Sequence, residues 1–115
     1  MSNYEDVKTA LLKFREERDW NQFHDPKNLA EAISIEAGEL LEVFLWKTKE
    51  EATNLNNKDK ESVREEVADI FNFLVYLCIE QDIDIFEVSL KKIEDNRRKY
   101  PVTKSLGTAK KYKEL

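Results

Sequence analysis

Leu29–Trp46, LAEAISIEAGELLEVFLW, and Val63–Cys78, VREEVADIFNFLVYLC, are the two stretches that decide the fold of this chain. In both, apolar residues recur every three or four positions, which is the spacing of one face of an α-helix. Each stretch also places two acidic residues three positions apart, so that both lie within the apolar stripe. These residues are Glu36 and Glu39 in the first stretch and Glu66 and Asp69 in the second. The pattern predicts two amphipathic helices with carboxylates on their inner faces.

Four carboxylates close together in the interior need a source of positive charge, because burial and mutual repulsion would otherwise protonate some of them. The nearby basic residues Lys47 and Arg64 are expected on other helix faces. A hard divalent cation would resolve the conflict, and oxygen ligands favour Mg²⁺, with Mn²⁺ as the alternative. A di-iron bundle would need Glu-x-x-His on two helices. The only histidine, His24, lies outside both stretches, so that reading is rejected.

The composition predicts a single all-α domain spanning residues 1–115. The chain has 41% apolar and 37% charged residues, with only two glycines and two prolines. Such a composition suits helices and one modest core. The net charge of −5 argues against nucleic acid as a partner, since that would call for a basic surface. A small phosphorylated ligand stays compatible, because a metal ion can supply positive charge locally.

A soluble cytoplasmic protein is the expectation for localisation. The lone Cys78 rules out an internal disulfide and fits a reducing compartment. No apolar run approaches the roughly 20 residues that a membrane-spanning helix needs, and the first residues lack the apolar core of a signal peptide. No membrane partner is therefore expected.

The four expected helices form a four-helix-bundle-type unit and cover residues 3–18, 26–48, 60–81 and 84–99 approximately. Asp25-Pro26 is typical of an N-cap followed by a first-turn proline, and Asp84 with Glu87 resembles a capping box. A loop is predicted at Asn54–Asp59, and Pro101 should end the last helix before a basic C-terminal tail, residues 101–115. The second and third helices should form an antiparallel hairpin that brings the two acidic pairs together.

The spacing of the acidic pairs resembles the metal motif of the MazG-like, all-α nucleoside triphosphate pyrophosphohydrolases. E36-x-x-E39 and E66-x-x-D69 match that motif. Further segments, W20-N-Q-F-H24, K92-I-E-D-N96-R-R-K-Y100-P-V and the closing K111-Y-K-E-L, are similar to the dCTP pyrophosphatase branch. The similarity extends from Trp20 to Leu115, and only the first helix is generic.

The resemblance implies hydrolysis of a (deoxy)nucleoside triphosphate, dCTP or a modified dCTP, to the monophosphate and pyrophosphate. It also implies a homodimer or homotetramer with sites between subunits. Glu36, Glu39, Glu66 and Asp69 would be Mg²⁺ ligands. The residues that match the base pocket are Trp20, His24 and Trp46, and those that match phosphate and sugar contacts are Lys92, Asn96, Arg97 and Tyr100. One departure is Phe73, where relatives carry a tyrosine, which leaves the base or sugar preference open.

Chemistry at an α-phosphorus mainly requires positioning and neutralisation of charge, which a metal held by carboxylates provides. Glu39 is the candidate base for the attacking water, and Glu36 is the carboxylate whose loss should abolish turnover. Two alternatives stay open. One is a non-catalytic helical interaction module with a structural cation, and the other is a relative that acts on a different pyrimidine or a damaged nucleotide.

Overall fold

The computed structural model describes residues 2–115, and this part of the chain is all-α, without strands. The α-helices are α1 (Tyr4–Glu17), α2 (Pro26–Phe44), α3 (Lys49–Thr53), α4 (Asn57–Glu80), α5 (Ile85–Lys99) and α6 (Val102–Ser105). Two short 3₁₀ helices, η1 (Asn21–Phe23) and η2 (Tyr112–Glu114), complete the description. The predicted fold class is confirmed, and α1, α2, α4 and α5 are the four expected helices.

Side-chain caps fix where the helices begin. Asp25 accepts a hydrogen bond from the Asn28 amide at 2.9 Å, and Pro26 is the first residue of α2, as the sequence predicts. Asp84 likewise accepts from the amides of Phe86 and Glu87 at 3.1 and 3.2 Å at the start of α5. These caps satisfy backbone donors that have no partner within the helix.

Two predicted boundaries were wrong between the main helices. The helix expected to continue to Thr48 ends at Phe44, because Trp46 adopts a left-handed backbone conformation with φ of 70°. Thr48 then starts α3 through a capping box with Glu51, a signal that the sequence contains. The loop expected at 54–59 is also shorter, since the Asn56 side chain accepts from the Asp59 amide at 2.8 Å and begins α4.

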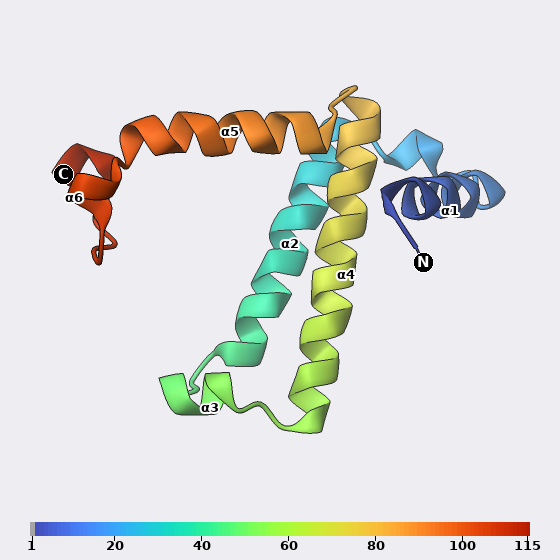
Figure 1. Ribbon diagram of the computed structural model, residues 1–115. Coiled ribbons are helices and arrows are strands. Elements are labelled where there is room, and N and C mark those ends of the chain that lie inside the picture. The colour runs from blue at the N-terminus through green and yellow to red at the C-terminus, as the bar shows by residue number, and fades with distance from the viewer. Residues whose placement is uncertain (1) are drawn as a thin grey trace. The chain divides into compact units, whose positions relative to one another are not determined.

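The α2–α4 pair is the centre of the first of two compact units, which ends at Asp82. Figure 1 shows α2 and α4 side by side and joined through α3, which confirms the predicted antiparallel hairpin. The most buried side chains of this unit are Leu29 on α2 and Val75, Tyr76 and Cys78 on α4. The core therefore lies where the beginning of α2 meets the end of α4.

The second compact unit is Ile83–Leu115 and contains α5, α6 and η2. Within it, the Tyr100 and Tyr112 rings meet edge to face at 6.2 Å, and the Lys99 ammonium lies 5.0 Å from the Tyr112 ring centre. The segment expected to be a basic tail thus includes short helical turns that contact the end of α5. That residues 1–115 form a single domain stays a prediction.

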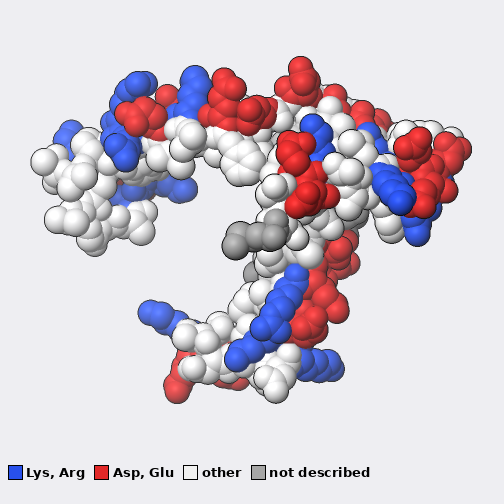
Figure 2. Space-filling view, turned by 45° about the vertical axis from the view of Figure 1, so that its right-hand side comes forward, with Lys and Arg blue, Asp and Glu red and all other residues white. Residues whose placement is uncertain are grey.

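The surface charges are mixed in sign. Figure 2 shows acidic and basic side chains interspersed over the face that it presents, without a broad basic area. Many of these charges pair locally along a helix, as Lys91 and Arg98 do with Asp95. Such exposed pairs contribute little to stability. None of the helices within residues 2–115 is both long and apolar enough to cross a membrane.

A buried charge attaches α1 to the hairpin. Arg15 is only 6% exposed, and its Nη1 lies 2.7 Å from Glu80 Oε1. The guanidinium also lies 5.1 Å from the centre of the Tyr76 ring, and the Tyr76 hydroxyl donates to the Leu11 carbonyl at 2.7 Å. These contacts hold α1 against the end of α4.

Replacing Glu80 by glutamine should lower the free energy of unfolding by about 1–3 kcal/mol, because Arg15 would be left buried without its counter-charge. The matched control is Glu31→Gln, which disrupts only the exposed pair with Lys27 at 3.8 Å. That change should cost less than about 0.5 kcal/mol. Urea unfolding of both variants measures the difference, and equal small effects would contradict a structural role for the buried pair.

Candidate active site

Three of the four predicted carboxylates converge between α2 and α4. Glu36, Glu39 and Glu66 each offer a carboxylate oxygen, and these atoms lie within 4.8 Å of one another. Glu36 and Glu66 are half-buried, whereas Glu39 is exposed. The i, i+3 spacing places Glu36 and Glu39 on one face of α2. The hairpin turns this face towards Glu66 on α4.

Asp69, the fourth predicted ligand, lies one helical turn beyond Glu66 on α4 and is outside this close group. It is exposed, and its charge still acts on Glu36. The structure therefore separates a compact group of three carboxylates from a fourth at its edge.

The group is electrostatically strained without a cation. Interaction with the Glu66 carboxylate, then burial and then Glu39 and Asp69 raise the pKa of Glu36 to about 7. Glu36 Oε2 and Glu66 Oε2 are buried and make no hydrogen bond within the described chain. The basic side chains Lys47 and Arg64 form ion pairs with other acids, Lys47 with Asp59 at 3.1 Å and Arg64 with Glu61 at 3.3 Å. Unpaired carboxylate oxygens in this arrangement fit a hard divalent cation.

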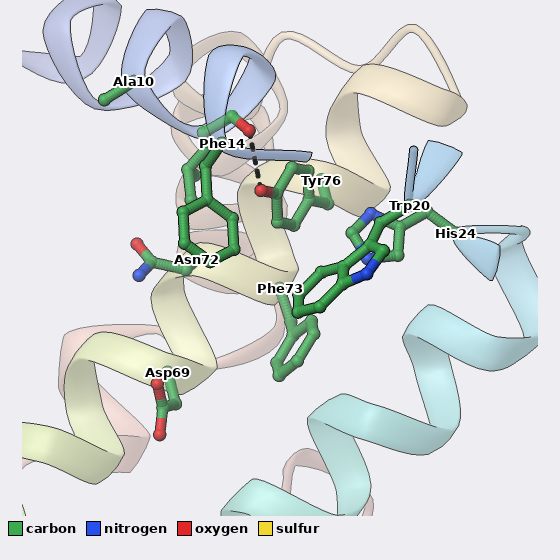
Figure 3. Close-up of a pocket in the computed structure, with 9 residues that line it drawn as sticks. Ala10, Phe14, Trp20, His24, Asp69, Asn72, Phe73 and Tyr76 are labelled. Atoms are coloured by element: carbon green, nitrogen blue, oxygen red, sulfur yellow. Dashed lines mark hydrogen bonds between the residues drawn. The ribbon is translucent and has the colours of Figure 1, made fainter. Parts of the chain in front are cut away.

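A cavity of about 330 Å³ adjoins this cluster, between α1, η1 and α4. Its walls are formed by Ala10, Leu11, Phe14, Trp20, His24, Asp69, Asn72, Phe73 and Tyr76 (Figure 3). Asp69 belongs to the cavity wall and follows Glu66 by one turn, a rise of about 4.5 Å. The polar cluster and the mostly apolar cavity are therefore neighbours along α4.

Aromatic rings dominate the cavity. Phe14 and Trp20 meet edge to face at 5.6 Å, and the rings of His24 and Tyr76 lie 4.5 Å apart. Burial first, and then the charge of Arg15, lower the pKa of His24, so its ring is neutral at pH 7. Such a wall offers flat, uncharged faces on which a planar group can stack.

The cavity unites some of the predicted substrate-binding residues. Trp20, His24 and Phe73 line it together, and their roles in substrate binding stay predictions. Trp46 is not part of its wall, and its side chain is 92% exposed.

The remaining predicted contacts, Lys92, Asn96, Arg97 and Tyr100, belong to the second unit. Lys92 is exposed, Asn96 and Tyr100 are half-buried, and Arg97 Nε lies 3.8 Å from Glu94 Oε2. Their roles in substrate binding stay predictions.

Sequence reasoning missed several cavity residues, chiefly Phe14, Asn72 and Tyr76. Tyr76 is buried and also belongs to the cavity wall. The available signal was the spacing Asp69, Asn72, Phe73 and Tyr76, which places all four on one face of α4. The first helix could not be recognised as a wall, because its apolar spacing is shared by ordinary core helices.

Comparisons with known proteins identify the family of this chain. The model of the MazG-like family matches residues 32–115. The chain belongs to the MazG-like family. It is also 41% identical over 113 residues to dCTP pyrophosphatase 1 of Bos taurus, and 37% identical over 113 residues to dCTP pyrophosphatase 1 of Homo sapiens. These alignments confirm the resemblance to the dCTP pyrophosphatase branch.

The extent of these matches differs between relatives. The alignments cover 96% of this MazG-like chain but 67% of the bovine and 66% of the human protein, so the chain spans about two thirds of the length of these curated relatives. A solved structure of a pyrophosphatase from Archaeoglobus fulgidus DSM 4304 is 40% identical, with a TM-score of 0.82. That match covers 88% of this chain and 94% of the archaeal one, which confirms the all-α fold.

The raised pKa of Glu36 predicts a pH-dependent stability of the metal-free protein. The folded state holds a proton that the unfolded chain has released above its ordinary pKa of 4.5, so stability should fall as pH rises through about 7. Glu36→Gln should remove most of this dependence and raise the melting temperature at pH 8. Thermal melts in chelator from pH 5 to 8 measure both effects. A wild-type curve that rises or stays flat over this interval would contradict the assignment.

The left-handed backbone of Trp46 should affect stability more than contacts of its exposed ring do. A non-glycine residue in the left-handed region costs about 1–2 kcal/mol, which glycine avoids. We expect Trp46→Gly to be more stable than Trp46→Ala by about 1 kcal/mol, with neither variant far below wild type, because the ring is 92% exposed. Urea unfolding at low protein concentration tests this. Losses above about 3 kcal/mol in both variants would show instead that the ring is buried by a second chain.

Proposed function

We propose that this chain hydrolyses a (deoxy)nucleoside triphosphate to the monophosphate and pyrophosphate, with Mg²⁺ bound by Glu36, Glu39, Glu66 and Asp69. The enzyme class, a nucleoside triphosphate pyrophosphohydrolase, agrees with the MazG-like family and with relatives named dCTP pyrophosphatase. The observation that carries the proposal is the position of a carboxylate cluster beside an aromatic cavity on the same helix. Cation-bound phosphates and a stacked base require such neighbouring environments.

Mg²⁺ is the favoured cation, with Mn²⁺ as an alternative, because the cluster offers only oxygen atoms. When bound, such a cation neutralises phosphate charge and lowers the pKa of a bound water. The three close carboxylates would supply the ligands, and Asp69 would join them from the cavity side. Glu36 must release its proton to act as a ligand, so cation affinity should rise with pH.

Glu39 is the proposed general base. It is exposed, whereas Glu36 and Glu66 each bury one carboxylate oxygen. An exposed carboxylate can accept the proton of an attacking water while its neighbours stay engaged as ligands. Glu39 would bind the cation through one carboxylate oxygen and accept the proton on the other.

The proposed substrate is dCTP or a modified dCTP. This rests on the named relatives and on the cavity, where Trp20, His24 and Phe73 provide uncharged rings. Phe73 offers no hydroxyl, so the polar contacts that choose the base or sugar must come from other side chains. A different pyrimidine triphosphate or a damaged nucleotide would use the same rings.

We also propose a homodimer or homotetramer in which Trp46, Lys92, Asn96, Arg97 and Tyr100 complete the site. Many large apolar side chains are exposed in the described chain, including Ile35 and Leu41 on α2 and Leu90 on α5. Exposed apolar surface of this kind is typical of an interface between chains. A partner copy would cover it and could supply cationic side chains to the phosphates.

Pyrophosphate release from a panel of dNTPs and NTPs, with Mg²⁺ or with chelator, tests the proposal. Wild type should hydrolyse one or a few pyrimidine nucleotides only with the cation, and Glu36→Gln should lose at least about a hundredfold in rate. The matched control is Glu42→Gln on the same helix, outside the cluster and exposed, which should keep wild-type activity. A folded, cation-binding wild type that hydrolyses no nucleotide would favour a helical interaction module with a structural cation.

A further inference from the structure

Asn72 is a polar residue in an otherwise apolar run, IFNFLVYLC, in the middle of α4. Asparagine is a poor helix former there, since its side chain competes for backbone hydrogen bonds in other conformations. It is half-buried and lines the cavity together with Asp69, Phe73 and Tyr76 from the same helix face (Figure 3). Because Asn72 disfavours the helix and lines a cavity, it is a candidate for contact with a ligand.

The Asn72 amide is free to bind a ligand. No hydrogen bond involves its side chain within residues 2–115, although an amide offers two donors and an acceptor with two lone pairs. The other polar groups of the wall are differently placed. The Tyr76 hydroxyl donates to the Leu11 carbonyl, and His24 Nδ1 is buried without a hydrogen-bond partner within the described chain. Asp69 can only accept when ionised, whereas the Asn72 carboxamide can both donate and accept.

The position of Asn72 along α4 suits a group distant from the phosphates. It lies six residues after Glu66, which corresponds to a rise of about 9 Å. A nucleotide with its phosphates at the carboxylate cluster would span this interval with its sugar. Its base would then reach the cavity wall to which Phe73 and Asn72 both contribute, with side chains that point in different directions from α4 (Figure 3).

We propose that Asn72 hydrogen-bonds the polar edge of the substrate base and so determines base preference. This inference rests on the proposed function, because it places the base of the hydrolysed nucleotide in the cavity. Pyrimidine edges carry adjacent donors and acceptors, and a carboxamide is complementary to such a pair. Phe73 and Trp20 contribute stacking, which all bases share, whereas Asn72 contributes the contact that differs between bases.

The test compares Asn72→Leu and Asn72→Asp with wild type on the four dNTPs and on 2-deoxyribose 5-triphosphate, which lacks a base. Both changes should lower kcat/KM for the preferred dNTP by about tenfold to a hundredfold, mainly by raising KM. The differences in kcat/KM among the four dNTPs should become smaller. Turnover of the base-free analogue should stay within about twofold for Asn72→Leu. Asn72→Asp keeps the side-chain shape, so it tests the donor even if the leucine disturbs packing.

Asn57→Leu is the matched control, because it makes the same substitution at the exposed first turn of α4 and should change nothing. Wild-type base preference and kcat/KM in both Asn72 variants would overturn the inference while leaving the proposed function intact. An equal loss for the dNTPs and the base-free analogue would overturn it too, since that result indicates a structural role. A wild type inactive on every dNTP would instead defeat the proposed function.

Discussion

Repulsion among carboxylates between α2 and α4 is the constraint on which the rest of the structure depends. Glu36, Glu39 and Glu66 meet within 4.8 Å, and no lysine or arginine of the described chain neutralises them. A hairpin with this interior loses stability for as long as the charges stay uncompensated. The cost falls between α2 and α4, where the three carboxylates each offer an oxygen to the same point.

The second determinant of the site is the change of environment along α4. Glu66 belongs to a polar cluster, and Phe73 and Tyr76, about two and three turns later, belong to an aromatic wall. Asp69 and Asn72 mark the transition between them. Helix α4 therefore contributes to both the ionic and the stacking environment in a fixed order and at a fixed spacing, while α2 completes the carboxylate cluster and the residues around η1 complete the aromatic wall.

Much of the hairpin could be predicted from sequence, because the 3.6-residue period, the Asp25-Pro26 start and the acidic spacing are local signals. The predicted end of α2 was wrong because Trp46 adopts the left-handed conformation there. Glycine usually occupies such a position, so a tryptophan gives no local signal for the end of the helix. The sequence predicted four carboxylates together, and the structure brings Glu36, Glu39 and Glu66 within 4.8 Å and leaves Asp69 outside that group, because the separation depends on how the helices pack. The contribution of α1 to the cavity depends on the buried Arg15 and Tyr76 contacts, which no spacing in the sequence reveals.

The way α1 is attached has a consequence for local unfolding of this protein. The helices α2 and α4 pack along much of their length, whereas α1 meets α4 locally, through the Arg15–Glu80 pair and the Tyr76 hydroxyl bond. Fluctuations that detach α1 would leave the hairpin and its carboxylates intact but would remove one wall of the cavity. The two halves of the site thus belong to regions of different local stability, and a ligand that touches both would couple them.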